Sequence, residues 1–317
     1  MTSIPDISII INNYNYAAFL PRAIDSALAQ TGVRAEVIVV DDGSSDDSAR
    51  VIEGYGTAIR PVLKPNGGQA SAINAGVAVA RAPILAFLDA DDWLMPGKSA
   101  AVLAAFAAEP RAVLVYHRLQ PTFSDGRRAF RAIPPSLCSG DLAPRLARSG
   151  GRWPFPLTSA LAVRRSAWDE AGEIPAQFRI SADAWLTGIL PFLGPVVALP
   201  EALAVYRIHN NTWFRQQDDK PMLRRRLAHW EDSVAVTNAF LAARGRPERV
   251  SVADHFDHGL AAARLALPGA PGRGALLWRG LLDAGEPKLV RRILQTLRGL
   301  AAVRRDTSAP AVAVEAR

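Results

Sequence analysis

Three carboxylates, those of Asp89, Asp91 and Asp92, fall within four residues directly after the uncharged run Ile84–Leu88. Carboxylates this close repel one another, and a bound cation removes that repulsion. An all-oxygen ligand set suits Mg²⁺ or Mn²⁺, and such an ion keeps coordination positions open for water and substrate phosphates. The spacing therefore predicts a divalent-cation site that accepts a diphosphate, with a solvated helix-capping loop as the plainer alternative.

A second acidic segment, residues 41–46, follows another apolar run, Val37–Val40. Asp, Gly and Ser form turns and helix caps by themselves, so this segment alone indicates only a turn. In an open parallel sheet, however, ligands bind beyond the carboxyl ends of the strands. We therefore expect both acidic segments at strand ends that face a ligand.

The elements that must position these residues follow from the apolar periodicity. Short β-branched runs alternate with alanine-rich segments of helical spacing, which is typical of a mostly parallel sheet covered by helices. The expected strands are Ile7–Ile11, Glu36–Val40, Pro61–Leu63, Ile84–Leu88 and Val113–Tyr116. The expected helices are Pro21–Gln30, one from Ser45 or Asp46 through Tyr55, Gln69–Ala80 and Lys98–Ala108. Loops and short elements are expected from Pro121 to Trp153.

Charge is unevenly distributed along the 317 residues. Residues 1–210 carry 19 basic and 19 acidic side chains, whereas residues 211–317 carry 18 and 11, so the whole net charge of +7 lies in the C-terminal third. Beyond Phe214 the sequence is helical and arginine-rich, and Thr307–Arg317 is expected to be a loose tail. We place a domain boundary between residues 214 and 215.

Competing nucleotide-binding folds are excluded because they bind phosphate through glycine-rich loops. The first strand runs into Asn12-Asn13-Tyr14 with no glycine, which argues against a Rossmann dehydrogenase. Gly97-Lys98-Ser99 imitates the end of a P-loop, but Asp92 stands where that loop needs its first glycine.

Compartment signals in the sequence favour the cytoplasm. The single cysteine, Cys138, excludes a disulfide framework and any multi-cysteine zinc site. The N-terminal residues lack a secretory signal. The longest uncharged stretch, Ala184–Pro200, is broken by Gly188, Pro191, Gly194 and Pro195, so no membrane span is predicted.

Four motifs in a fixed order resemble those of glycosyltransferase family 2. They are Ser8–Asn15, Val39–Asp46, Asn66–Gly76 and Phe87–Asp92, with weaker similarity reaching about residue 211. Members of this family are inverting, nucleotide-sugar-dependent enzymes. The resemblance implies an α/β fold of the GT-A type, a mostly parallel sheet flanked by helices, here followed by a C-terminal helical extension. Residues 1–214 would be the catalytic domain (1–116 the nucleotide-sugar half, 117–214 the acceptor half), and 215–317 the basic extension.

The resemblance also implies residue roles. Asn12 and Tyr14 would lie beside the base, with the Tyr14 ring as a stacking surface, although a proline is common in the family before the second asparagine of Asn12-Asn13. Asp42 would hold base or ribose, and Arg207, in Tyr206-Arg207-Ile208-His209, would pair a phosphate. The implied donor ligands are Asn12, Tyr14, Asp42, Asn74, Asp89 and Arg207. The implied ligands of Mg²⁺ or Mn²⁺ are Asp91, Asp92, Asp89 and His209, where an ordinary polar residue leaving a strand is the alternative for His209.

Inverting transfer needs a base that takes the proton of the acceptor hydroxyl. In relatives this base is a carboxylate at a helix start, commonly in a Glu-Asp pair. The comparable segment, Arg179–Leu186, contains one acid, Asp183, which is the candidate base. A helix-capping role for Asp183 is the alternative, and Ser181 is the other residue that can occupy the position of the base.

These residues together predict an inverting glycosyltransferase that moves a sugar from a nucleoside diphosphate donor, with uracil favoured as the base, to a hydroxyl of a glycan or lipid-linked acceptor. Bacterial cell-surface polysaccharide synthesis is the expected setting, by family analogy. A nucleotide-sugar-binding protein without transferase activity is the alternative, because the motif around Asp183 is reduced.

The segment Lys288–Arg305 places Leu289, Ile293, Leu297 and Leu300 on one helical stripe. Each of its six basic residues contributes about 1 kcal/mol of binding free energy near an anionic membrane, so together they contribute at most ~6 kcal/mol. One interpretation is therefore a reversible peripheral contact at the inner face of the membrane. A helix that packs its leucines on the catalytic domain is the other. Nucleic acid is not expected as a partner, because the basic segments lack interleaved aromatic residues.

Overall fold

The computed structural model of the protein describes residues 4–209 and 219–308. The chain divides into two compact units, one formed by Met1–Leu142 and Phe155–Arg215 and the other by Ala143–Pro154 and Gln216–Arg317. The predicted boundary between residues 214 and 215 lies outside the described residues, as do residues 309–317 of the predicted tail.

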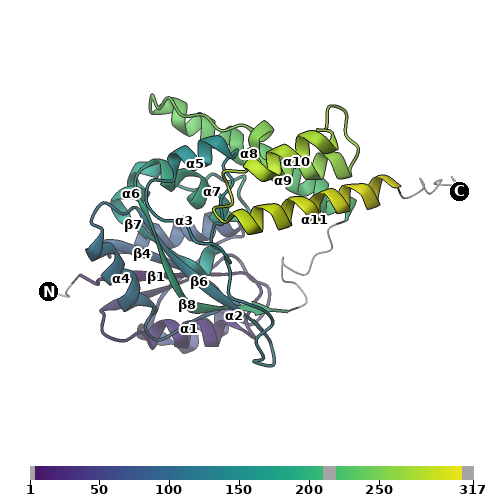
Figure 1. Ribbon diagram of the computed structural model, residues 1–317. Coiled ribbons are helices and arrows are strands. Elements are labelled where there is room, and N and C mark those ends of the chain that lie inside the picture. The colour runs from purple at the N-terminus through teal and green to yellow at the C-terminus, as the bar shows by residue number, and fades with distance from the viewer. Residues whose placement is uncertain (1–3, 210–218, 309–317) are drawn as a thin grey trace, which may run out of the picture. The chain divides into compact units, whose positions relative to one another are not determined.

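The first unit is built on an eight-stranded mixed sheet of order β3-β2-β1-β4-β7-β6-β8-β5 (Figure 1). Strands β3, β2, β1 and β4 are parallel, and β7 runs antiparallel to β4 and β6. The strands are β1 (Ile7–Asn13), β2 (Ala35–Asp41), β3 (Arg60–Leu63), β4 (Ile84–Asp89), β5 (Trp93–Leu94), β6 (Leu114–Phe123), β7 (Leu161–Arg164) and β8 (Val196–Ile208). The five strands and four helices expected from the N-terminal sequence are all present, and the expected α/β class is confirmed.

Helices flank this sheet. They are α1 (Leu20–Leu28), α2 (Ser48–Gly54), α3 (Gln69–Val79), α4 (Lys98–Ala108), α6 (Arg165–Ala171) and α7 (Ala182–Ile189), with short 3₁₀ turns η1 (Gly56–Ala58), η2 (Thr158–Ala160) and η3 (Leu190–Phe192). A proline in the sequence marks the start of α1. Pro21 stands in the first turn of α1, where its missing N–H costs no hydrogen bond.

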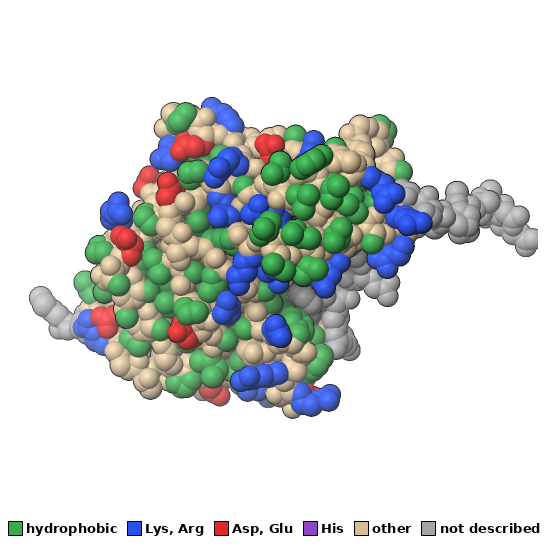
Figure 2. Space-filling view, viewed as in Figure 1, with side chains coloured by type: hydrophobic (Ala, Val, Ile, Leu, Met, Phe, Trp, Pro, Cys, Tyr) green, Lys and Arg blue, Asp and Glu red, His purple; other side chains and the backbone are tan. Residues whose placement is uncertain are grey.

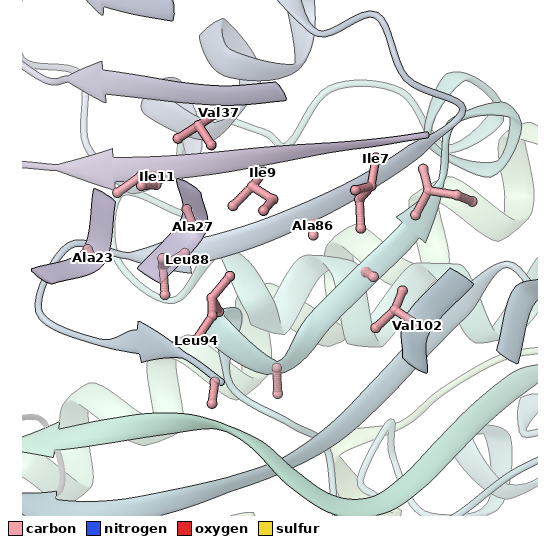
Figure 3. Packing of buried hydrophobic residues seen from close by; sticks show 14 of the residues in the cluster. Ile7, Ile9, Ile11, Ala23, Ala27, Val37, Ala86, Leu88, Leu94 and Val102 are labelled. Atoms are coloured by element: carbon pink, nitrogen blue, oxygen red, sulfur yellow. The ribbon is translucent and has the colours of Figure 1, made fainter. Parts of the chain in front are cut away.

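The core lies against the central strands. Alternate residues of β1 and its neighbours pack on one face of the sheet (Figure 3), including Ile7, Ile9, Ile11, Val37, Ala86 and Leu88. On the other face α3 approaches so closely that a Cβ at Gly76 would lie 2.4 Å from Cγ2 of Ile10. Strand β1 is therefore buried on both faces, which explains its continuous apolar run.

Strand β6 is longer than predicted. The sequence suggests a loop from Pro121 onward, because proline has no N–H to donate to a strand ladder. In the structure β6 continues to Phe123, with Pro121 opposite Tyr206 of β8, and the parallel pairing extends to Ile208. The expectation of a loop over residues 121–123 is wrong. The pairing brings the end of β8 toward the predicted site.

The second unit is helical. Its helices are α5 (Ala143–Arg148), α8 (Lys220–Ala243), α9 (Phe256–Arg264), α10 (Arg273–Leu282) and α11 (Leu289–Ser308), with the 3₁₀ turn η5 (Val252–Asp254). The sequence places residues 143–154 in the N-terminal domain, but in the structure they belong to this unit. The cause is the buried Arg152, whose guanidinium pairs with Asp257 (Nε–Oδ2 2.6 Å) and with Asp283. Across the described parts of the chain, we find no helix with the length and apolarity that crossing a membrane requires.

Candidate active site

The ends of three strands meet at one edge of the sheet. The register aligns Asn12 of β1 with Asp89 of β4, and Asn13 with Asp41 of β2. The two acidic segments therefore follow neighbouring strands, as the parallel arrangement predicts. The other residues of the candidate site are held in place by contacts with this edge.

Asp89 is connected to both halves of the first unit by hydrogen bonds. Its Oδ1 accepts from Asn12 Nδ2 and from Gln69 Nε2, each at 2.9 Å. The side-chain oxygen of Gln69 in turn accepts from the backbone N–H of Ala182 at 3.0 Å. Burial and the neighbouring charge of Asp91 raise the pKa of Asp89 to about 7. Gln69 thus joins the Asp-x-Asp segment to the first turn of α7.

Asp92 points into the protein and is only 1% exposed. Its Oδ2 accepts from Ser159 Oγ at 2.6 Å and its Oδ1 from the N–H of Arg207 at 2.9 Å. Ser159 Oγ also accepts from the N–H of Asp89 at 3.1 Å. Burial, helped by Asp91 and Asp89, raises the pKa of Asp92 well above its ordinary value. Asp92 therefore holds η2 and β8 against the end of β4.

Asp91 and His209 form the other half of the acidic segment. His209 Nε2 lies 2.8 Å from Asp91 Oδ2, and both side chains are largely but not fully buried. The imidazole packs edge-on against Tyr16, with ring centroids 5.7 Å apart. Arg207 donates from Nε to the carbonyl oxygen of Asp91 at 2.7 Å. The end of β8 is thereby fixed to the Asp-x-Asp loop.

The predicted metal set, Asp89, Asp91, Asp92 and His209, stays a prediction. Among residues 4–209 and 219–308, no three acidic, histidine or cysteine side chains converge closely enough to hold an ion by themselves. The two oxygens of Asp92 are engaged inside the protein, and Asp89 is held by Asn12 and Gln69. Asp91 and His209 lie next to each other as an oxygen and nitrogen donor pair. Two protein ligands suit an ion that completes its coordination with phosphate and water.

Two predicted donor ligands, Asp42 and Asn74, make hydrogen bonds within the protein. The Asp42 carboxylate accepts from Lys64 Nζ at 2.5 Å and from the N–H groups of Gly67 and Gly68 at 3.0 and 2.7 Å, so it anchors the loop before α3. Asn74 exchanges two hydrogen bonds with the backbone of Ile174, at 2.9 and 3.0 Å. The donor-binding assignments of Asp42 and Asn74 stay predictions.

Tyr14 remains available as a stacking surface, because its side chain is 48% exposed. The loop that carries it is fixed at Asn15, which adopts the left-handed conformation (φ 58°) that asparagine tolerates. Asn15 Oδ1 accepts from the N–H of Ser45 at 2.7 Å, and the N–H of Asn15 donates to Ser44 Oγ at 2.8 Å. The loop after β1 and the acidic segment after β2 are thus one rigid piece.

Asp183 lies in the first turn of α7 and is 6% exposed. Ser181, the cap residue of this helix, is left-handed (φ 65°) and makes no side-chain capping bond. Burial raises the pKa of Asp183 to about 6, against the lowering effect of the backbone N–H groups of Ala184 and Asp183. Its charge also contributes to the raised pKa of Asp89. A carboxylate of this kind can accept a proton near neutral pH.

Sequence reasoning missed Gln69, Ser159, Lys98 and His117. Lys98 is fully buried and donates to the carbonyl oxygen of Ser159 at 3.3 Å, and burial lowers its pKa to about 7. His117 is also fully buried, and burial followed by the Lys98 charge lowers its pKa to about 3. A lysine in the first turn of an expected helix carries no signal of burial, because that turn is usually solvated. Gln69 had a signal, since it opens the predicted helix that follows the Asn66–Gly68 loop.

Lys98 gives a testable dependence of stability on pH. The unfolded lysine keeps its proton up to about pH 10.4, whereas the folded one loses it near 7, so the unfolded state binds more protons between these values. We expect the free energy of unfolding to rise by on the order of 2 kcal/mol from about pH 7 to about pH 9. Urea denaturation of the wild type and Lys98→Met measures it. The variant should lack this rise, and equal slopes in both proteins would contradict the loss of the Lys98 proton near pH 7 in the folded state.

A family model and two curated relatives match the chain. The model, described as "Glycosyl transferase family 2", matches residues 8–169. An uncharacterized glycosyltransferase of Nostoc sp. is 42% identical over 210 residues, which are 64% of this chain and 65% of that protein. The chondroitin synthase of Pasteurella multocida is 40% identical over 126 residues, 39% of this chain and 13% of the synthase. The chain thus spans less than two thirds of the length of either relative.

Two solved structures share the fold. S. aureus TarS 1-349 in complex with UDP-GlcNAc superposes with a TM-score of 0.55 at 15% identity, over 95% of this chain and 92% of that one. The mannosyltransferase PcManGT from Pyrobaculum calidifontis, in complex with GDP-Man and Mn²⁺, gives a TM-score of 0.54 at 17% identity, over 97% and 88%. Such identities support the GT-A type of fold alone. The family follows from the matched model, which covers more than half of the chain and contains the four motifs identified in the sequence. The chain belongs to glycosyl transferase family 2.

Proposed function

We propose that the chain is an inverting glycosyltransferase that moves a sugar from a nucleoside diphosphate donor, with UDP favoured, to a hydroxyl of a glycan or lipid-linked acceptor. The observation that carries the proposal is the connection of Asp183 through the first turn of α7 and Gln69 to Asp89. The burial of Asp183 and its raised pKa of about 6 support its proposed role as the base.

The proposed reaction is a single displacement. Asp183 takes the proton from the acceptor hydroxyl as the acceptor oxygen bonds to the anomeric carbon of the donor. The bond from that carbon to the diphosphate breaks on the opposite face, so the anomeric configuration inverts and a nucleoside diphosphate leaves. Tyr14 offers its exposed ring to the base, and Arg207 and Asn12 complete the proposed donor contacts.

Metal dependence is part of the proposal. Asp91 and His209 would hold Mg²⁺ or Mn²⁺, since a carboxylate and an imidazole 2.8 Å apart match the ligands these ions accept in a two-ligand site. The ion would supply positive charge that stabilises the leaving diphosphate. Asp91 is the stronger candidate ligand of the two, because carboxylate oxygen is the preferred partner of hard cations.

The assignment of the two parts of the catalytic domain and the cellular setting are also proposals. Residues 1–214 would form the catalytic domain, with 1–116 as the nucleotide-sugar half and 117–214 as the acceptor half. The chain would act in polysaccharide synthesis, in the cytoplasm at the inner face of the membrane. The name of the Pasteurella relative, a chondroitin synthase, supports a polysaccharide product.

Stereochemistry of slow donor hydrolysis tests the proposal without knowledge of the acceptor. The full chain is incubated with UDP-glucose, UDP-galactose, UDP-GlcNAc or GDP-mannose and Mn²⁺, and the released sugar is followed by proton NMR. These donors are α-linked, so we expect the β anomer to appear first with at least one of them. Early α anomer would contradict inversion, and absence of release with added acceptor extracts would favour a binding protein without transferase activity.

A further inference from the structure

Helix α11 exposes several large apolar side chains and buries Thr296 and Val303. Leu289, Val290 and Leu297 are 54–69% exposed, whereas Thr296 is fully buried. The buried side packs closely, since a Cβ at Gly299 would lie 2.5 Å from Cδ1 of Leu260. Leu289 and Leu297, two of the leucines on the stripe expected from the sequence, are thus exposed.

Helix α10 extends the same apolar surface. It packs on α11 where Gly280 meets Thr296, and Trp278 and Leu282 are 65% and 71% exposed. Figure 2 shows hydrophobic side chains gathered over the region that α10 and α11 occupy in Figure 1, with Lys and Arg side chains around them. We call this surface the α10–α11 apolar face, defined by Trp278, Leu282, Leu289, Val290, Leu294 and Leu297. A contiguous exposed apolar surface with a polar rim marks an interaction site.

The rim of this face is basic. Between residues 273 and 306 the exposed charged residues are Arg273, Arg279, Lys288, Arg298, Arg304 and Arg305. The three carboxylates of the same stretch each pair with an arginine: Asp283 with Arg152, Glu286 with Arg291, and Asp306 with Arg264. The face therefore presents positive charge around an apolar centre, and none of the acidic residues in this described stretch is exposed.

We propose that the α10–α11 apolar face docks onto an anionic lipid bilayer, with both helices lying in the interface plane. A helix of this kind buries its apolar side chains at the boundary of headgroups and acyl chains and pairs its basic side chains with anionic lipids. Docking through this face would hold the protein at the inner face of the membrane, and in this the inference rests on the proposed function. The docking itself requires no transferase activity.

A second copy of the chain is a poorer occupant of this face. A two-fold contact would bring the same basic rim onto itself, and like charges around a desolvated contact oppose association. Nucleic acid is also disfavoured, because six large apolar side chains, of which only Trp278 is aromatic, offer no platform on which bases stack. A second copy of the chain is a separate outcome of the experiment.

The apolar arm of the test uses Trp278→Gln with Leu282→Gln in the full chain, sedimented with vesicles of phosphatidylcholine and phosphatidylglycerol. The matched control is Ile4→Gln with Leu63→Gln, which are 68% and 61% exposed on the first unit. We expect the α10 pair to lower partitioning by at least about a hundredfold, roughly tenfold for each lost side chain. The control pair should bind like the wild type, and all melting temperatures should agree because the sites are exposed.

The charge arm uses Arg298→Gln with Arg305→Gln against the control Arg111→Gln with Arg127→Gln. Each lost charge near an anionic surface should weaken binding about fivefold, so the first pair should lose about 25-fold and the control little. Vesicles of phosphatidylcholine alone should bind the wild type weakly. The Asp183→Asn variant should bind vesicles normally, which separates failure of docking from failure of transfer.

Three results would overturn the inference. The first is wild-type protein that does not bind the anionic vesicles. The second is equal binding by the α10 pair and its control. The third is a dimer in light scattering that dissociates in the Trp278→Gln, Leu282→Gln variant, because a second copy would then cover the face.

Discussion

Replacing Asp183 by Asn is expected to lower kcat for sugar transfer by about three orders of magnitude, since a positioned general base contributes about 10²–10⁴-fold. Asparagine keeps the shape of the side chain but accepts no proton. Donor affinity should remain within a few-fold of the wild type, because Asp183 faces the acceptor in this proposal. The melting temperature should not fall, because a buried carboxylate is replaced by a neutral group. Steady-state kinetics with donor titration measures both effects.

The pH profile carries an independent prediction for the same residue. The base must be ionised, and the pKa of Asp183 is raised to about 6, so log kcat/KM should be level above this pH and fall with unit slope below it. In Asp183→Asn this acid limb should vanish from the residual activity. Asp169→Asn, an exposed acid on α6, is the matched control and should keep the wild-type profile. If Ser181→Ala removes activity while Asp183→Asn retains it, the base has been assigned to the wrong residue.

Replacing Asp91 by Asn should lower kcat/KM by at least about a hundredfold and abolish the response to Mn²⁺, because the proposed metal loses its only carboxylate ligand. The fold should be unaffected, since Asp91 is bonded through its side chain to His209 at the edge of the site. Activity titrated with Mn²⁺ after removal of metal by a chelator measures the change. Wild-type metal dependence in Asp91→Asn would place the ion elsewhere.

Asp92 provides the contrast, because the two neighbouring acids have different environments. Asp92→Ala removes the bonds to Ser159 and to the N–H of Arg207, and should lower the free energy of unfolding by about 2 kcal/mol. Thermal unfolding therefore separates the variants: Asp92→Ala should melt earlier, and Asp91→Asn at the wild-type temperature. If Asp91→Asn melted at a lower temperature than Asp92→Ala, the assignment of Asp92 to the protein interior and of Asp91 to the site would be contradicted.

Much of the fold was predictable because its signals are local. Buried parallel strands such as Ile84–Leu88 read as short apolar runs, and the acidic residues after them mark the ligand-binding edge. The extension of β6 through Pro121 was not predictable in this way, because the proline suggests a strand end and only the pairing with β8 overrides it. The same holds for residues 143–154, whose place depends on the distant partners of Arg152.

The candidate site was predictable in its residue types but not in its hydrogen bonds. The motifs identify Asp42 and Asn74 but not their partners Gly67, Gly68 and Ile174, which lie 25 to 100 residues away. Gln69 opens a predicted helix, but the sequence does not show that its side chain bonds both Asp89 and the N–H of Ala182. Long-range hydrogen bonds of this kind leave no periodicity in the sequence.

Calorimetric titration of the full chain with UDP, with and without Mn²⁺, tests the central claim most directly. If the Asp91 and His209 pair holds an ion beside a diphosphate at the end of β1 and β4, then UDP should bind in Mn²⁺ and lose most of its affinity in chelator or in Asp91→Asn. GDP is titrated in parallel to identify the base. Failure of both nucleotides to bind, or binding that is the same without metal and in Asp91→Asn, would contradict a metal-assisted diphosphate site.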